Sequence, residues 1–438
     1  MTNKLLIAFA ALMAAGFAAL FGGVFHEPTA AAPDALAASQ SAEDFKAGFA
    51  LNASTATLVQ SLQSTLAANA KDEHSWVLLG LAYQQRARET GDPSYYTKSG
   101  GALERALSLD HQDYLAFSGL GSLALSRHRF TVALILGHKA NSLAPMTARN
   151  YGVIADAEIE LGRYRQAFRD FNTMNRLRPS LSSYARVSYG RELIGNTRGA
   201  IKAMKLAIDA ATDTTEPTAW THVQLGKLYF NHGRITAAAR EFRIANAAFP
   251  GYAYGLDALA SAQAARGQLK AALKIEQEAV NVIPLPQYVA TLGDLYRATG
   301  RPVLAERQYA LIGAIEKLLR ANGVRVDLEI ALFDVDHGIR LSHALALARA
   351  GQRDRPSIDG DDVLGWALER NGRCGQARHY SQLALRLGMQ DALKFFHRGM
   401  IERCLGDAAA ARTWFRRALA LNPHFSLLWS PVARRYAS

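Results

Sequence analysis

The sequence is poor in residues that interrupt helices or carry redox chemistry, since its 438 residues include only 13 prolines and two cysteines. Both cysteines, Cys374 and Cys404, lie far from the amino terminus, which excludes a lipid-modified amino-terminal cysteine. Few prolines and a hydrophobic fraction of 49% argue against disorder, because this much apolar surface can offset the chain entropy lost on folding. We therefore expect a folded chain of closely packed helices.

The sequence also lacks the common catalytic and cofactor motifs. It contains no Gly-x-Ser-x-Gly elbow, no His-Glu-x-x-His, no phosphate-binding loop and no Cys-x-x-Cys. The run Gly119-x-Gly121-x-x-Ala124 approaches the dinucleotide-binding pattern, but no strand precedes it and small residues there suit a repeat helix. We expect no enzyme activity, no cofactor and no small-molecule substrate.

Two acidic runs are candidate metal sites. The first, Asp334-Val335-Asp336-His337-Gly338 followed by His343, places two carboxylates and an imidazole within one helical turn, but helical spacing turns Asp334 and Asp336 about 200° apart. The second, Asp359-Gly360-Asp361-Asp362, is typical of an amino-terminal helix cap. The sequence predicts no metal ligands, and metal handling or metal-dependent catalysis at His337 is the least favoured alternative.

The charge balance is basic, with a formal net charge of +12 and a pI near 9.7. Such a balance can indicate nucleic-acid binding, but the basic residues are spread over the chain and no nucleic-acid motif is present. We expect no nucleic-acid partner. Acidic polymers, anionic lipid headgroups or acidic peptides are the better-matched counter-charges.

The amino-terminal segment, residues 1–27, carries an uncharged apolar run from Leu5 to Phe25 behind Lys4. The run is long enough to cross a bilayer as a helix, so a removable signal peptide and an uncleaved membrane anchor both stay open. Positive charge before the run, with Glu27 and Asp34 after it, predicts that the remaining chain is exported to the periplasm or the cell exterior. Residues 28–54 are expected to be a flexible linker.

A repeat of 34 residues dominates the rest of the sequence. Pro145 and Pro179 are one period apart, as are Pro250 and Pro284. The run Trp76-x2-Leu79-Gly80-x2-Tyr83 begins one unit, and a later unit carries Gly226, Tyr229, Ala238, Phe242, Ala245 and Pro250. Small residues at fixed places let two helices approach closely, a ring fills the gap to the next unit, and proline ends the second helix.

The repeats predict an all-α chain of about ten helix pairs. A capping helix is expected from Thr55 to Ala68, an insertion at Glu89–Tyr95 is expected to protrude as a loop, and the polar run Thr212–Pro217 is expected to be another loop. Asn322-Gly323 marks the expected bend, which divides a solenoid part at 55–321 from a second part at 322–438. Residues Phe425–Trp429 should cap the last pair.

These motifs resemble the tetratricopeptide repeat (TPR) family over residues 55–425, and the architecture is similar to exported or membrane-anchored bacterial TPR proteins. The resemblance implies an α-solenoid, a right-handed superhelix whose first helices line a concave groove for peptides or protein partners. The clamp that some members use for carboxylate tails is absent, because the matching places carry Ser118, Ser122, Gly152, Asp156, Ala185 and Tyr189. The groove positions implied here are Arg149, Asp156, Tyr189, Trp220, Lys227, Tyr254, Asp257, Arg297, Trp366, Phe396 and Arg403.

The sequence therefore predicts a non-enzymatic interaction scaffold in the cell envelope, contacting the membrane through its amino-terminal helix if that helix is retained. The alternative is a periplasmic chaperone-like factor that holds exported polypeptides during cytochrome or envelope assembly. Cys374 and Cys404 are 30 residues apart, close to one period. They could bridge adjacent repeats in an oxidising compartment, and two separately packed thiols are the other possibility.

Overall fold

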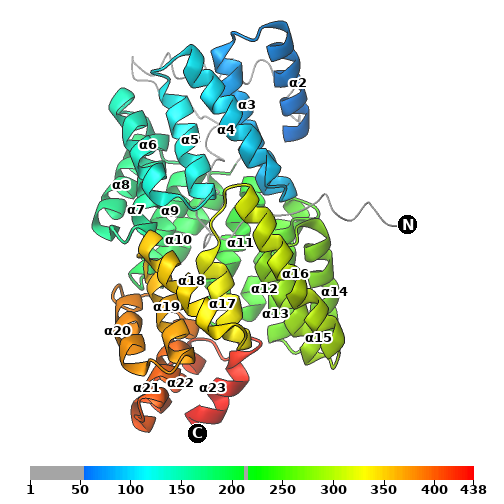
Figure 1. The fold of residues 1–438 in the computed structure, drawn as a ribbon, viewed down its shortest axis with the longest axis vertical. Helices are drawn as coiled ribbons and strands as arrows, with labels where there is room; N and C mark the ends of the chain where they lie inside the picture. Colours follow the sequence, from blue (N-terminus) through cyan, green and yellow to red (C-terminus); the bar gives the residue numbers. More distant parts are fainter. Residues whose placement is uncertain (1–53, 212–215) are drawn as a thin grey trace.

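The computed structural model describes residues 54–211 and 216–438 (Figure 1), and the expected leader and most of the linker lie outside this part. The described residues form 22 α-helices and no strand. None of these helices combines the length and apolarity that spanning a membrane requires. The helices are α2 Thr55–Ala68, α3 Glu73–Thr90, α4 Ser94–Leu109, α5 Tyr114–Ser126, α6 Phe130–Leu143, α7 Ala148–Glu160, α8 Tyr164–Leu177, α9 Leu181–Leu193, α10 Thr197–Asp209, α11 Glu216–Asn231, α12 Ile235–Ala248, α13 Ala253–Ala265, α14 Leu269–Val282, α15 Pro286–Ala298, α16 Pro302–Ala321, α17 Asp327–His337, α18 Leu341–Asp354, α19 Ile358–Arg370, α20 Cys374–Ala384, α21 Ala392–Cys404, α22 Ala408–Leu421 and α23 Trp429–Ala437.

The helices pack in consecutive antiparallel pairs, from α3 with α4 to α21 with α22. The expected ten pairs are therefore confirmed within the described residues, with α2 and α23 covering the two ends. In most pairs the turn between the helices contains a glycine with positive φ, such as Gly233 at 69° and Gly406 at 84°. His128 takes that place between α5 and α6 with φ 54°, a conformation that L-residues rarely adopt.

Small residues set the distance between the two helices of a pair. At Gly226 in α11, an added Cβ would lie 2.3 Å from Cε1 of Phe242 in α12, and at Gly399 in α21 it would lie 2.6 Å from Cε1 of Phe415 in α22. Both rings are fully buried. The small residue and the large ring of the repeat pattern are therefore in direct contact, as the sequence predicts.

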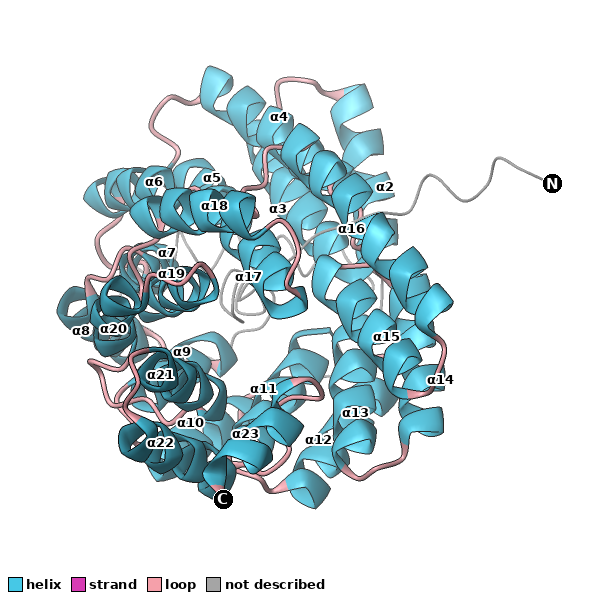
Figure 2. Cartoon of the chain, turned by 60° about the horizontal axis from the view of Figure 1, so that its bottom comes forward, coloured by secondary structure: helices cyan, strands magenta, loops and turns pink. Residues whose placement is uncertain are grey.

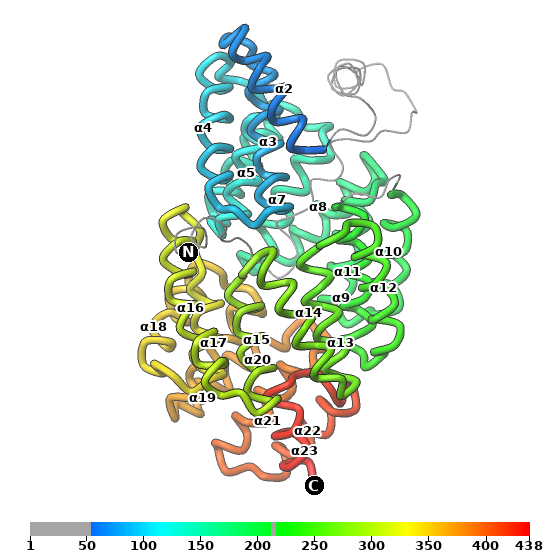
Figure 3. Tube along the Cα trace, turned by 90° about the vertical axis from the view of Figure 1, so that its right-hand side faces the viewer, coloured from blue at the N-terminus to red at the C-terminus, as the bar shows by residue number. Residues whose placement is uncertain are grey.

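The superhelix is tightly wound, so that helices about one turn apart touch. Arg355 Nη2 donates to Glu160 Oε1 at 3.1 Å across 195 residues, and Asn422 Nδ2 donates to the Phe230 carbonyl across 192 residues. At about 34 residues per pair, these separations correspond to between five and six pairs per turn. In Figure 3, α16–α19 accordingly lie beneath α3–α7.

The contacts between successive turns are buried and polar. Arg355 also pairs with Glu329 of its own turn at 3.3 Å, and its guanidinium lies 5.6 Å from the centroid of the Phe130 ring on the first turn. The amide nitrogen of Ile358 donates to the Tyr164 hydroxyl at 2.7 Å. Successive turns are therefore held in position by hydrogen bonds between them.

One prediction about the insertion in the first pair is wrong. Residues Glu89–Tyr95 do not protrude as a long loop, because α3 continues to Thr90 and α4 begins at Ser94. The short turn between them lies against the following superhelical turn, where a Cβ at Gly91 would be 2.4 Å from Ile283 Cγ2. The extra residues lengthen both helices instead.

The later boundaries agree more closely with the sequence pattern. Of the run 212–217, Glu216 and Pro217 belong to α11, and 212–215 lie outside the described residues. Helix α16 ends at Ala321 as expected, and Gly323 has φ 79°. One hydrophobic cluster nevertheless continues across this point, since it includes Leu319, Val324 and Ile330.

The carboxyl-terminal cap extends beyond the expected segment into α23. Trp429 stacks on Phe396 with ring centroids 5.3 Å apart and meets Trp366 edge-on at 5.6 Å. Its indole Nε1 donates to Asp336 Oδ1 at 3.0 Å. The cap is therefore fixed to α17, α19 and α21 together.

Candidate functional site: the inner surface and the carboxyl-terminal pocket

The first helices of the pairs form the inner layer of the superhelix. In Figure 2, α3, α5 and α11 lie closer to the middle of the ring than their partners α4, α6 and α12. Successive first helices also contact one another, as α5 contacts α7 and α17 contacts α19. The positions implied by the TPR resemblance all belong to this inner layer.

Five of the eleven implied groove positions are buried. Trp366 and Phe396 have no exposed surface and belong to the core beneath the carboxyl-terminal cap, whereas Tyr189 and Trp220 belong to the core of α9–α12. Asp156 is bound by the guanidinium of Arg186, with Nε at 2.9 Å and Nη2 at 2.6 Å. A buried ring or paired carboxylate holds the fold together and offers little surface to a partner.

The other six positions keep some exposed surface, but several already have contacts within the chain. Arg297 pairs with Glu306 at 2.6 Å, and the guanidinium of Arg403 lies 4.3 Å from the centroid of the Tyr436 ring. The half-buried Arg149 donates to Ser118 Oγ and Ser122 Oγ. Lys227, Tyr254 and Asp257 complete the set, with Lys227 exposed.

An acid-rich cluster, which we define as Glu192, Lys227, Asp257, Asp359, Asp391 and Lys394, joins the two superhelical turns on the inner surface. Lys394 on α21 binds Asp359 Oδ1 at 2.8 Å and Asp391 Oδ2 at 2.9 Å. Although burial alone would raise them, the Lys394 ammonium holds the pKa values of Asp359 and Asp391 below their usual range. Both carboxyls are therefore ionised at neutral pH.

The same cluster includes two carboxyls from the first turn whose pKa values are raised. Burial raises the pKa of Glu192 to about 7, with nearby Asp391 adding to the effect and the Asn231 side chain opposing it. Burial likewise raises the pKa of Asp257 to about 6, which the charge of Lys227 partly opposes. These four carboxyls outnumber the two ammonium groups of the cluster above pH 7, and the nearby Arg355 guanidinium offsets part of the excess at Asp359.

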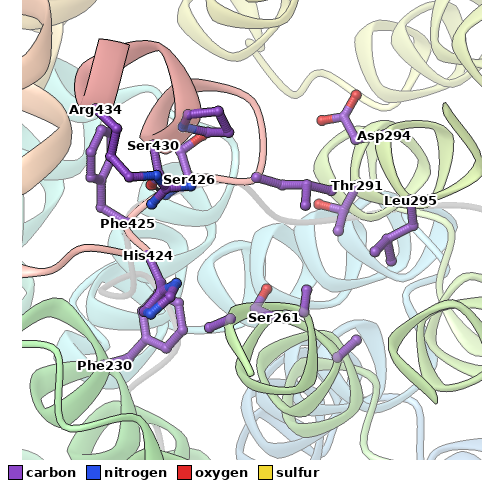
Figure 4. Close-up of a pocket in the computed structure, with 15 residues that line it drawn as sticks. Phe230, Ser261, Thr291, Asp294, Leu295, His424, Phe425, Ser426, Ser430 and Arg434 are labelled. Atoms are coloured by element: carbon purple, nitrogen blue, oxygen red, sulfur yellow. Dashed lines mark hydrogen bonds between the residues drawn. The ribbon is translucent and has the colours of Figure 1, made fainter. Parts of the chain in front are cut away.

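A pocket of about 320 Å³ opens where the carboxyl-terminal segment faces α13 and α15. Small and polar side chains of those helices form one wall, including Ala260, Ser261, Ala264, Thr291 and Asp294, while Phe230 lies at its edge. His424, Ser426, Ser430 and Arg434 form the opposite wall (Figure 4). Its size falls at the lower end of the range for ligand sites.

Asp294 is held firmly at the side of this pocket. It accepts a hydrogen bond from the Tyr309 hydroxyl at 2.6 Å and from His337 Nε2 at 2.9 Å. Burial works to lower the pKa of His337, but the hydrogen bond and charge of Asp294 raise it overall. Asp294 is thus a fixed negative group opposite the positive Arg434.

The first candidate metal site, Asp334–Gly338 with His343, serves the packing between helices. Asp334 accepts a hydrogen bond from Arg340 Nη2 at 2.6 Å, and Asp336 accepts from Trp366 Nε1 at 2.8 Å. The described residues contain no group of three or more His, Cys, Asp or Glu side chains arranged to hold a metal ion.

The run Asp359–Asp362 does not supply the expected helix cap. Ser357 is the cap residue of α19, and its Oγ accepts from the Gly360 amide at 3.3 Å. The acidic side chains bind cationic side chains elsewhere, such as Asp361 with Arg386 in the turn after α20 and Asp362 with His397 on α21.

The carboxyl-terminal wall of the pocket was not predicted from the sequence. His424 and Arg434 lie in a cap segment that the repeat pattern does not cover, so no period predicts which side chains face the inner surface. The only available signal was the cluster of polar and aromatic residues around Pro423, which is typical of an ordinary end cap.

Cys374 at the start of α20 and Cys404 at the end of α21 form a disulfide, with Cα atoms 5.8 Å apart. The bond ties together two adjacent pairs, α19–α20 and α21–α22. It lies outside both the pocket and the acid-rich cluster.

No protein-family profile and no curated protein matches this chain. Among solved structures, it is similar to the Cut9 part of the APC/C hetero-tetramer Cut9–Hcn1 (TM-score 0.40, 14% identity, 86% of this chain and 81% of that chain covered). The human IFIT1 dimer with PPP-AAAA gives TM-score 0.47, 14% identity, and coverage of 83% and 86%. TTC0263, a TPR protein of Thermus thermophilus, gives TM-score 0.39 at 22% identity, and the match covers 44% of this chain and 99% of that chain. The described chain is an all-α, TPR-like repeat solenoid with structural similarity to TPR proteins.

Proposed function

We propose that this chain is a non-enzymatic scaffold that binds an extended segment of a partner protein at the carboxyl-terminal pocket and along the neighbouring inner surface. The pocket carries the proposal, because it is a concave site of about 320 Å³ on the inner layer of helices. Its walls combine small apolar side chains with fixed polar groups, which is the usual composition of sites that orient a ligand.

The pocket walls suit a peptide better than a rigid ligand. Ala260 and Ala264 leave room for side chains, while Ser261, Thr291 and Ser430 provide hydroxyls for peptide amides and carbonyls. The acid-rich cluster supports a partner segment with basic side chains, since Asp359 and Asp391 keep their charge at neutral pH.

A peptide-display selection against the purified chain tests this proposal. We expect the selected peptides to lose at least tenfold in affinity for Ala264→Trp, because an indole would fill the pocket. The matched control is Ala271→Trp, at an exposed place on α14 outside the pocket. Equal binding to both variants, or selection of no peptide, would refute pocket binding. Tight binding of many unrelated unfolded segments would favour the chaperone-like alternative.

Export to the cell envelope is the second part of the proposal. It is supported by the apolar run Leu5–Phe25 and by the disulfide between Cys374 and Cys404, because disulfides persist in oxidising compartments. Alkaline phosphatase joined to the carboxyl terminus should be active in whole cells, whereas a fusion lacking residues 1–27 should be inactive. Equal activities would refute export through this segment.

A further inference from the structure

Two second helices, α8 and α10, carry a stripe of exposed cations on the outer layer of the superhelix. Each helix buries one face, through residues such as Phe171 and Met204, and exposes the other. The cations recur at spacings of three, four or seven residues, which keeps those of each helix on the exposed face. They are Arg165, Arg169 and Arg176 on α8, and Arg198, Lys202 and Lys205 on α10.

These six cations have little compensating charge. Among the described residues, none of them forms an ion pair with a carboxylate. The acids on the two helices are the half-buried Asp170 and the exposed Asp209. Helix α14, on the opposite side of the ring in Figure 2, is closer to balance, because Glu278 is exposed there with Lys270 and Lys274. The positive charge of α8 and α10 is therefore available to an anionic partner.

The next superhelical turn continues this basic side of the molecule. The guanidinium of Arg386, just after α20, lies 5.3 Å from the centroid of the Tyr164 ring at the start of α8. A Cβ at Gly233, just before α12, would lie 3.2 Å from the Leu421 carbonyl oxygen at the end of α22. Figure 2 accordingly shows α20 next to α8 and α22 next to α10. Helix α22 contains no acid and exposes Arg412, Arg416 and Arg417. We define the exposed cations of α8, α10 and α22 as the basic outer face.

Exposed apolar side chains lie beside these cations. Leu206 directly follows Lys205 on α10, and Ile244 directly follows Arg243 on α12; both apolar side chains are 39% exposed. Each pair occupies the ninth and tenth places of its helix, so the two pairs lie at the same level of the outer layer. Ile194, in the turn before α10, is 50% exposed. Cations together with exposed apolar side chains are typical of surfaces that bind a membrane interface.

We propose that the basic outer face binds the surface of a bilayer that contains anionic lipids. A flat surface touches a convex superhelix along a strip parallel to its axis, and the face has this shape because its helices belong to two successive turns. Each arginine or lysine near an anionic bilayer contributes about fivefold to the affinity. The face shares no residue with the carboxyl-terminal pocket, so this inference is independent of the proposed peptide binding.

Partitioning of the full-length chain between buffer and vesicles tests the inference. The apolar run Leu5–Phe25 can insert into any bilayer, so the informative quantity is the ratio of two partition constants. One is measured with vesicles containing about 30% phosphatidylglycerol, and the other with phosphatidylcholine alone. We expect a ratio of at least about 100 at an ionic strength of about 0.1 M, falling towards one at about 1 M, because salt screens surface charges. A ratio near one at the lower salt concentration would overturn the inference.

Charge reversal on two different helices locates the contact. Lys202→Glu with Lys205→Glu should lower the ratio at least about tenfold. The matched control is Lys270→Glu with Lys274→Glu on α14, which changes the net charge equally and should lower the ratio less than about twofold. Circular dichroism checks that both variants fold. An equal loss in both variants would show that net charge, and not this face, attracts the bilayer, and would overturn the inference.

Replacement of the apolar side chains separates a bilayer from a soluble polyanion. Leu206→Ser with Ile244→Ser should weaken binding to the anionic vesicles about three- to tenfold, because less apolar surface enters the interface, and should leave retention on heparin unchanged. Unchanged vesicle binding of this variant would contradict insertion of these side chains. Retention of the chain on heparin or duplex DNA without any preference for anionic vesicles would show that the face binds a soluble polyanion, and the inference would be wrong.

Discussion

Replacement of Arg355 by alanine should loosen the contact between the two superhelical turns. Arg355 and its partner Glu160 are buried, and the side chain of its second partner, Glu329, is only 7% exposed, so loss of Arg355 leaves two carboxylates without their main counter-charge. Breaking a buried pair in this way costs about 3–5 kcal/mol. Loss of the contact with Phe130 adds to this cost.

Denaturant unfolding followed by circular dichroism measures the loss of stability, and small-angle scattering measures whether the turns separate. The matched control is Arg325→Ala, because the pair of Arg325 with Asp354 lies in the same region but is about half exposed on both sides. Pairs of that kind contribute about 0–1 kcal/mol. If Arg355→Ala costs no more than the control, the buried contact does not hold the turns together.

The remaining carboxyls give this experiment a second readout. Burial already raises the pKa of Glu329 to about 7 against the opposing charge of Arg355, so removal of that charge should raise it further. Neutral carboxyls need no counter-charge, and the penalty of Arg355→Ala should therefore be smaller at pH 5.5 than at pH 8. Replacing both Glu160 and Glu329 by glutamine should recover part of the lost stability.

Three further predictions concern stability. Burial, with acidic neighbours adding to it, raises the pKa values of Glu73 and Glu158 to about 8, so the folded chain binds more protons than the unfolded chain between about pH 4.5 and 8. Urea unfolding should show stability falling as pH rises through this window, and Glu158→Gln should flatten the profile; a flat wild-type profile would contradict the shifts. Gly226→Ala should lower the free energy of unfolding by about 1–3 kcal/mol, because the added methyl group would meet Phe242. Adding Phe242→Leu should recover part of this loss. An unchanged melting temperature of Gly226→Ala would contradict the close approach of the two residues. Cys404→Ser should cost about 3–4 kcal/mol, since the disulfide closes a loop of 30 residues, and reduction of the wild type should match it.

The repeat pattern predicted the helix pairs because their causes are local. A small residue such as Gly226 and a ring such as Phe242 recur at fixed spacing, and the tight turns recur with them. Helix ends at Thr55 and Ala321 were predicted for the same reason, since capping and glycine chemistry depend on near neighbours.

The contacts between superhelical turns could not be predicted from the sequence. Glu160 and Arg355 are 195 residues apart, and no periodic pattern marks them as partners. The protruding loop at 89–95 was wrongly predicted for this reason, because the following turn covers Gly91. The burial of Trp366 depends on a cap helix beyond the last repeat, which the pattern does not describe.

The tight winding changes how this chain should respond to truncation. In an open solenoid each unit touches only its two neighbours, so terminal units can be deleted one at a time with gradual loss of stability. Here a unit such as α7–α8 also touches the unit of α19. Deletion of the last three pairs would therefore expose the surface of the first turn that these pairs cover. Shortened forms of this protein should therefore fail abruptly, and fragments divided at Gly323 should associate with each other when mixed.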